Sequence, residues 1–194
     1  MHILGFMMYT PINHMTMSWA DPQDKQVTGF GSIKYWQGLA ATKHLGIATT
    51  VSAASLHPFL AVRSLSSLDF LSQGRVGWNI VTGNARSEHR AMGIDVVEHD
   101  ERYDRADEYL EICYALWNGI NPKAIKADAA NGIYADPDRI EKIDHNGKYF
   151  RCTATPSVLP SQQGRPVLFQ AGSSGRGPKF AVTHADVIFS SQPD

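Results

Sequence analysis

Short apolar runs alternate with amphipathic helical patterns along most of this 194-residue chain. Each run has the length of a buried strand, and each helical pattern repeats its apolar residues at steps of three and four. The predicted strands are residues 2–8, 45–52, 74–83, 167–170 and 186–190, and the predicted helices are residues 33–44, 58–71, 100–118 and 179–184. Buried strands that alternate with helices predict a parallel sheet covered by helices.

The predicted strand at residues 74–83 contains a polar residue that needs an explanation. Asn79 lies between the strand formers Val76, Trp78 and Ile80. A buried amide costs free energy unless it is hydrogen-bonded, so Asn79 is a candidate for contact with a ligand. The alternative is that Asn79 enters a turn and bonds to the neighbouring backbone.

Polar side chains also follow the other predicted strands. The pairs are Asn13 and His14, Thr49 and Thr50, Asn79 and Thr82, and Ser173 and Ser174. Active sites of (β/α)8 barrels and of open parallel sheets lie at the carboxyl ends of the strands. We therefore expect a functional site at this edge of the sheet.

The segment after the strand at residues 167–170 is rich in small residues and reads Ala-Gly-Ser-Ser-Gly-Arg-Gly-Pro. Small residues let the backbone approach an anion closely. The hydroxyls of Ser173 and Ser174, free backbone N–H groups, the start of the next helix and Arg176 could together bind phosphate. The segment matches neither GxxxxGK[ST] nor GxGxxG, so a flexible turn is the alternative.

His99 and Tyr103 lie four residues apart at the start of the helix predicted for residues 100–118, which Asp100 is expected to cap. At this spacing both side chains can reach one ligand at the amino end of the helix. The alternative is that Tyr103 packs in the core while His99 is solvated. The excursion that follows, at residues 121–147, has the length of an insertion or lid.

Composition excludes several classes of protein. The net charge of −1, without a basic run, argues against nucleic acid as a partner. No apolar stretch approaches the roughly 18 residues of a membrane span, and we expect no membrane association. Two cysteines, Cys113 and Cys152, and no visible export signal predict a cytoplasmic protein. The eight histidines lack the spacing of a metal hydrolase, so no metal is expected.

Six segments, in chain order, resemble one family. They are residues 48–52, 67–69, 74–82, 99–103, 148–150 and 164–174. Together they resemble the bacterial-luciferase-like flavin monooxygenases. The most similar branch contains nitrilotriacetate monooxygenase component A, dibenzothiophene sulfone monooxygenase and long-chain alkane monooxygenase.

The resemblance implies a luciferase-like (β/α)8 TIM barrel that inserts one oxygen atom from O₂ into a small organic substrate. It implies reduced FMN, supplied by a separate NAD(P)H:flavin reductase, and assembly as a homo-oligomer. His14 resembles a residue near the reaction centre and is the expected catalytic residue. The expected flavin contacts are Thr49 or Thr50, Asn79, His99, Tyr103, and Ser173 or Ser174, with the serine pair at the phosphate.

Two departures from the family pattern lead us to expect an incomplete barrel, a single partial domain over residues 1–194. Residues 39–43 join the first helix directly to the Thr-Thr strand, where the family has another strand unit, and the family continues past Asp194. The chain is then a fragment, an incomplete record or a degenerate gene product, expected to bind FMN weakly and not to complete oxygenation. A non-catalytic or vestigial flavin-binding protein and a deazaflavin-dependent oxidoreductase are the alternatives.

Overall fold

The computed structural model describes residues 4–5, 45–83, 85–172 and 175–189. The chain divides into two compact units, residues 1–48 and 49–194. In the first unit, strand β1 (Leu4–Gly5) pairs in parallel with the first residues of β2 (Gly46–Ser52). The helix predicted for residues 33–44 lies outside the described residues.

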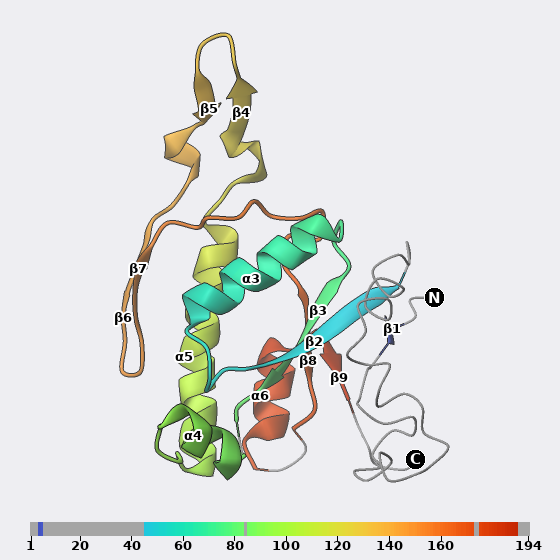
Figure 1. The fold of residues 1–194 in the computed structure, drawn as a ribbon, viewed down its shortest axis with the longest axis vertical. Coiled ribbons are helices and arrows are strands. Elements are labelled where there is room, and N and C mark those ends of the chain that lie inside the picture. Colours follow the sequence, from blue (N-terminus) through green and yellow to red (C-terminus); the bar gives the residue numbers. More distant parts are fainter. Residues whose placement is uncertain (1–3, 6–44, 84, 173–174, 190–194) are drawn as a thin grey trace. The chain divides into compact units, whose positions relative to one another are not determined.

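The second unit is built on a parallel sheet, as the strand–helix alternation predicts (Figure 1). The carboxyl part of β2 is followed in the sheet by β3 (Val76–Val81), β8 (Val167–Gln170) and β9 (Val187–Ile188). Strands β3 and β8 pair in parallel, with Asn79 opposite Phe169, and β8 pairs in parallel with β9. Two segments ninety residues apart therefore end at the same edge.

The helices largely follow the sequence patterns. They are α3 (Pro58–Leu71), α4 (Arg86–Met92), α5 (His99–Asn118) and α6 (Gly177–His184). Helix α3 matches its predicted bounds. Helix α5 begins at His99, so Asp100 lies in its first turn and does not cap it as predicted. Helix α4 occupies a stretch for which the sequence patterns predicted no helix, because only one of its seven residues is buried and it has no apolar stripe.

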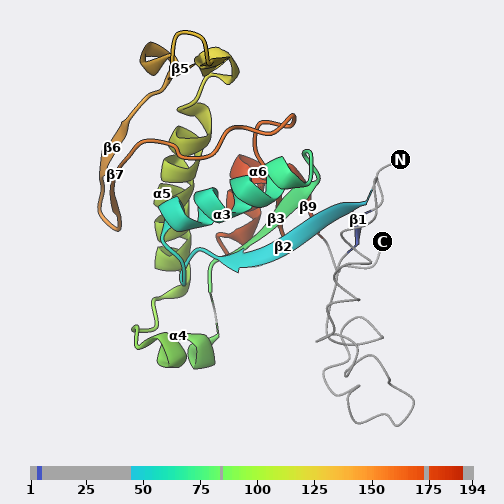
Figure 2. The same cartoon turned by 45° about the horizontal axis from the view of Figure 1, so that its top comes forward.

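The core lies where α3 and α5 cover β3 (Figures 1 and 2). Trp78 is fully buried, and its ring packs edge-on or tilted against those of Tyr109 and Trp117 at centroid distances of 6.1 and 6.3 Å. Cys113 is also fully buried, and burial raises the pKa of its thiol well above the usual value. The residues of β3 that pack in this core face the helices. Because side chains alternate along a strand, the residues between them, including Asn79, face the opposite side of the sheet.

Buried Asp69, the last residue of the Ser-Leu-Asp motif, ties three segments together. Its carboxylate accepts hydrogen bonds from the backbone N–H of Val76 at 3.1 Å, from the Gln163 amide at 2.5 Å and from the Ser161 hydroxyl. Asp69 is only 1 % exposed. A buried carboxylate with three donors fixes both the start of β3 and the loop that leads into β8.

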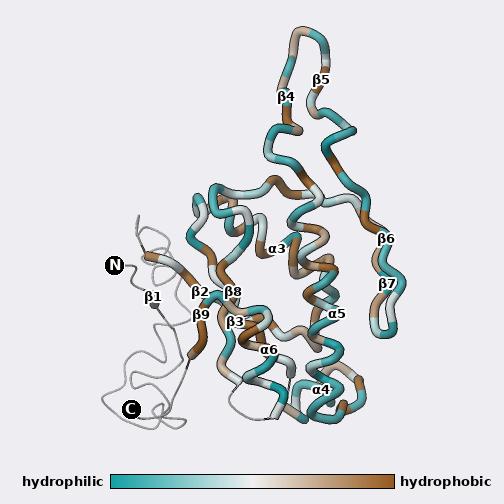
Figure 3. The backbone as a smooth tube through the Cα atoms, turned by 180° about the vertical axis from the view of Figure 1, so that it is seen from behind, coloured by the Kyte–Doolittle hydropathy of each residue, from teal (hydrophilic) through white to brown (hydrophobic). Residues whose placement is uncertain are grey.

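Residues 121–147, the predicted insertion, contain short 3-10 turns and hairpin strands. Strands β4 (Ile125–Asp128) and β5 (Ile133–Ala135) form one antiparallel pair, and β6 (Ile143–Asn146) pairs with β7 (Arg151–Ala154). Figure 1 shows the β4–β5 hairpin projecting away from the helices, and Figure 3 shows the β6–β7 hairpin as largely hydrophilic. The lid role of this insertion stays a prediction.

Glu108 on α5 anchors the β6–β7 hairpin. It accepts hydrogen bonds from the backbone N–H groups of Tyr149 and Phe150, at 3.0 and 2.8 Å, and contacts the His145 ring at 3.1 Å. Burial raises the pKa of Glu108, but the hydrogen bonds from Tyr149, His145 and Phe150 outweigh that effect, so the pKa lies below the usual glutamate value. The anchor therefore depends on the ionised carboxylate.

We expect Asp69→Ala to lower the free energy of unfolding by about 3 kcal/mol, because it leaves three donors, one buried and two half-buried, without their acceptor. Urea denaturation of the two proteins measures the difference. The exposed Asp95→Ala is the matched control and should change stability by less than about 0.5 kcal/mol. Equal effects of the two substitutions would show that Asp69 does not hold β3.

We expect Glu108→Ala to cost about 2 kcal/mol at neutral pH. Because folding lowers the pKa of Glu108, its contribution is complete above the unfolded-state pKa and is lost as the pH falls through the folded-state pKa. The stability difference from the parent protein should therefore shrink in acid. Denaturation curves at several pH values, with exposed Glu111→Ala as control, measure it; a difference independent of pH would contradict the role of the ionised carboxylate.

Candidate functional site

Asn79 and Thr50 meet on one face of the sheet. The Asn79 amide nitrogen donates a hydrogen bond to the Thr50 hydroxyl at 3.0 Å. Thr50 is exposed and Asn79 is buried. Consecutive strand residues face opposite sides of a sheet, so Thr49 does not share this face with Asn79. Of the two threonines named from the sequence, only Thr50 lies beside Asn79.

The other end of the Asn79 amide has no partner among the residues that the structure describes. Its side-chain oxygen is buried, and no group in the part of the chain that the structure describes donates a hydrogen bond to it. A buried carbonyl oxygen left this way costs on the order of 1–3 kcal/mol. Its position, on the face away from the helices, is the arrangement expected of an acceptor kept for a ligand's N–H group.

His99 and Tyr103 lie one turn apart at the start of α5, as predicted, and both parts of the alternative description also hold. Their ring centroids are 5.2 Å apart. The Tyr103 ring is buried against Phe180 of α6, whereas the His99 side chain is 41 % exposed and contacts Asp100 through Nδ1 at 2.7 Å. The tyrosine is fixed by packing and the histidine remains open to solvent.

Three glycines after β8 lie against these two side chains. A Cβ on Gly172 would be 2.8 Å from the Tyr103 hydroxyl, and one on Gly177 would be 3.0 Å from it. Gly175 has a positive φ of 57°, and a Cβ there would be 2.6 Å from the His99 ring. Only glycine allows the backbone this close, so Gly172 and residues 175–177, here called the glycine segment, lie directly against the amino end of α5.

Gln170, which sequence reasoning did not select, shapes the same segment. It is the last residue of β8 and is 3 % exposed. Its side-chain oxygen accepts a short hydrogen bond from the backbone N–H of Gly172. A polar residue at the end of a buried strand, like Asn79, is the signal that could have indicated it.

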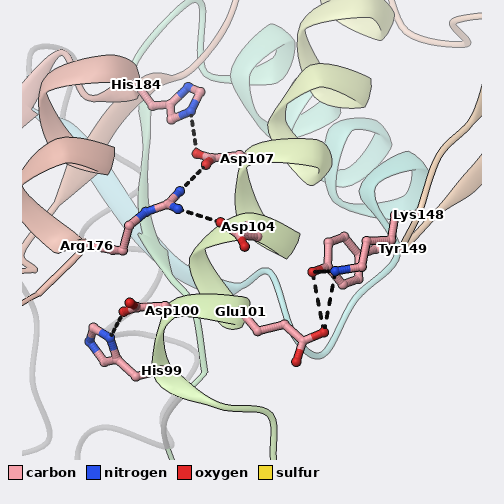
Figure 4. Close-up of polar contacts among 9 residues, drawn as sticks. All are labelled: His99, Asp100, Glu101, Asp104, Asp107, Lys148, Tyr149, Arg176 and His184. Carbon is pink, nitrogen blue, oxygen red and sulfur yellow. Dashed lines mark hydrogen bonds and ion pairs between the residues drawn. The ribbon is translucent and has the colours of Figure 1, made fainter.

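The structure gives Arg176 partners other than the phosphate suggested by the sequence. Its two terminal nitrogens donate to Asp104 and Asp107 of α5, at 2.5 and 2.7 Å (Figure 4). Asp107 also contacts the ring of His184, at the far end of α6, at 3.0 Å. The positive charge in the glycine segment is therefore neutralised by two carboxylates.

The described site does not include every residue named from the sequence. His14, Ser173 and Ser174 lie outside the described residues. Across residues 45–83, 85–172 and 175–189, no group of three His, Cys, Asp or Glu side chains is placed to hold a metal ion. Within the same ranges no helix has the length and apolar character to span a membrane.

A hollow of about 580 Å³ lies at the opposite end of α5. Its lining includes Asn118, Gly119, Gln163 and Arg165, from the carboxyl end of α5 and the chain that enters β8. Arg165 there is held by Asp186 through contacts of 2.7 and 2.9 Å. The other edge is the stronger candidate for the site, because the Asn79 oxygen that no described residue satisfies and the close approaches of the glycines occur there and not at this hollow.

Comparison with known proteins gives consistent results. The family model for luciferase-like monooxygenases matches residues 38–194. The chain is 47 % identical over 150 residues to a long-chain alkane monooxygenase of Geobacillus thermodenitrificans, covering 76 % of this chain and 34 % of that protein. It is 44 % identical over 156 residues to a dibenzothiophene-sulfone monooxygenase of Rhodococcus erythropolis, covering 80 % and 34 %.

Among solved structures, a riboflavin lyase crystallised with modified FMN and riboflavin superposes with a TM-score of 0.76 at 44 % identity, covering 81 % of this chain and 36 % of that one. The chain thus spans about a third of the length of the relatives it matches. The parallel sheet and its helices are part of a luciferase-like TIM barrel, as expected. This chain belongs to the luciferase-like monooxygenase family.

Proposed function

We propose that the chain binds FMN at the carboxyl edge of its sheet and serves an FMN-dependent monooxygenase. Asn79 and Thr50 would hold the polar edge of the flavin ring. Tyr103, His99 and the glycine segment would hold the ribityl phosphate, together with Ser173 and Ser174, which are assigned from the sequence alone. The relatives named above support this proposal.

The observation that carries the proposal is the buried oxygen of Asn79, which accepts no hydrogen bond from any described residue. The flavin ring of FMN carries N–H groups that can donate a hydrogen bond to such an acceptor. The phosphate of FMN can accept hydrogen bonds from backbone N–H groups that no side chain covers. Gly172 and Gly177 provide that backbone beside Tyr103, and Gly175 provides it beside His99. The residues present therefore fit FMN at both of its polar ends.

Reduced FMN, when bound, supplies the activation of O₂ in this class of enzyme. The chain's residues bind and orient it. The side-chain oxygen of Asn79 would accept a hydrogen bond from the flavin ring and so orient it. The buried side chain of Tyr103 packs against the glycine segment and limits its movement. His14, assigned from the sequence alone, would hold or move a proton near the ring. Exclusion of water would fall to the covering segments, with residues 121–147 as the proposed lid.

The proposed partners follow from the family. A separate NAD(P)H:flavin reductase would supply reduced FMN, O₂ would be the co-substrate, and the protein would work as a cytoplasmic homo-oligomer. The names of the relatives cover an alkane, an aromatic sulfone and riboflavin, so the substrate is proposed only as a small organic molecule.

The direct test is titration of the purified protein with FMN and with riboflavin, followed by flavin fluorescence. Riboflavin has the same ring but no phosphate. We expect FMN to bind at least about tenfold more tightly, because the glycine segment contributes only when a phosphate is present. Equal affinities would contradict the phosphate assignment, and no binding of either flavin would contradict the proposed function.

We expect Asn79→Leu to weaken FMN and riboflavin alike, by about tenfold, because Asn79 contacts the ring that both share. Without flavin the free energy of unfolding should change by less than about 1 kcal/mol, since the substitution removes an unsatisfied oxygen as well as a hydrogen bond. Asn118→Leu, in the hollow at the other end of α5, is the matched control and should leave both affinities unchanged. A large loss of stability with unchanged affinities would assign Asn79 to packing.

A further inference from the structure

We propose that Arg176 is a positioning residue. Its ion pairs with Asp104 and Asp107 hold the glycine segment against His99 and Tyr103, and the arginine does not itself bind the phosphate. This inference rests on the proposed function and concerns how the phosphate site is kept in shape.

The first support is the direction of the guanidinium group. Both terminal nitrogens donate to α5 carboxylates, at 2.5 and 2.7 Å, and the Nε atom is buried (Figure 4). The positive charge of Arg176 is balanced by the negative charges of Asp104 and Asp107, so these three side chains together offer no net positive charge to an anion. A phosphate there would have to be bound by neutral donors, such as backbone N–H groups and hydroxyls.

The second support is the place of Arg176 in the chain. It lies between Gly175, where a Cβ would be 2.6 Å from the His99 ring, and Gly177, where a Cβ would be 3.0 Å from the Tyr103 hydroxyl. All the groups it joins belong to the first nine residues of α5. The ion pairs therefore fix this backbone to the helix that carries His99 and Tyr103.

A third contact holds the other end of α6. The His184 ring contacts Asp107 at 3.0 Å and the Tyr114 hydroxyl at 3.2 Å, and it packs on Phe180 with ring centroids 4.8 Å apart. Helix α6 is thus attached to α5 at both ends. With its far end held, loss of the Arg176 ion pairs would free mainly the amino end, where the glycines lie.

The test compares FMN and riboflavin affinities in Arg176→Met. We expect the FMN dissociation constant to rise about tenfold while that of riboflavin stays within about twofold. The matched control is Arg165→Met, which removes an ion pair between both terminal nitrogens of an arginine and one aspartate, Asp186, away from the glycine segment. It should leave the ratio of the two affinities unchanged, and thermal unfolding checks that both variants are folded.

A second variant separates positioning from direct contact. In Asp104→Asn/Asp107→Asn, an arginine that bound the phosphate directly would be freed from its partners, and FMN affinity would be kept or increased. We expect instead a loss similar to that of Arg176→Met, with no further loss when all three substitutions are combined. Arg176→Lys keeps the charge without the planar fork, so we expect an intermediate loss.

The results distinguish this inference from the function on which it rests. Wild-type protein that binds neither flavin would overturn the proposed function, and equal affinities for FMN and riboflavin would overturn the phosphate assignment; either result would overturn the inference as well. Wild-type protein that prefers FMN, with folded Arg176→Met keeping that preference, would overturn the inference alone. So would FMN affinity kept or increased in the double aspartate variant. Should Arg176→Met not fold, the lysine and asparagine variants decide, because both keep most of the packing.

Discussion

The parallel pairing of β3 with β8 is the constraint on which the site depends. It places Asn79 opposite Phe169, so the polar end of β3 and the glycine segment after β8 leave the sheet at the same edge. Asp69 fixes the start of β3 and the entry to β8 by hydrogen bonds to both, and Trp78 fixes the helical side of the strand. Asn79 then faces away from the helices because side chains alternate along a strand.

Helix α5 also positions the proposed site, through packing contacts and through ion pairs. Its first turns carry the two aromatic rings against which the glycines pack and the two carboxylates that hold Arg176. Further along, Glu108 holds the β6–β7 hairpin. One helix thus connects the proposed phosphate site with the proposed lid region, although each contact is local.

Sequence patterns predicted the parts of the fold that are governed by local physics. Helix α3 and strand β8 have their predicted bounds, because Pro58 starts the helix and a compact apolar run defines the strand. Helix α4 was missed because its residues show no apolar stripe. The partners of Arg176 could not be predicted, since Asp104 and Asp107 lie about seventy residues away in the chain. The same holds for Gln170, whose role depends on the path of the backbone after β8.

Hydrogen–deuterium exchange with and without FMN tests the central claim, that the carboxyl edge of the sheet is a flavin site. We expect FMN to slow exchange of the amides at Gly172 and residues 175–177 and at the start of α5, because phosphate and ring would cover them. The hollow at Gly119 and residues 163–165 should show no change. Protection confined to that hollow, with none at the glycines, would contradict the account.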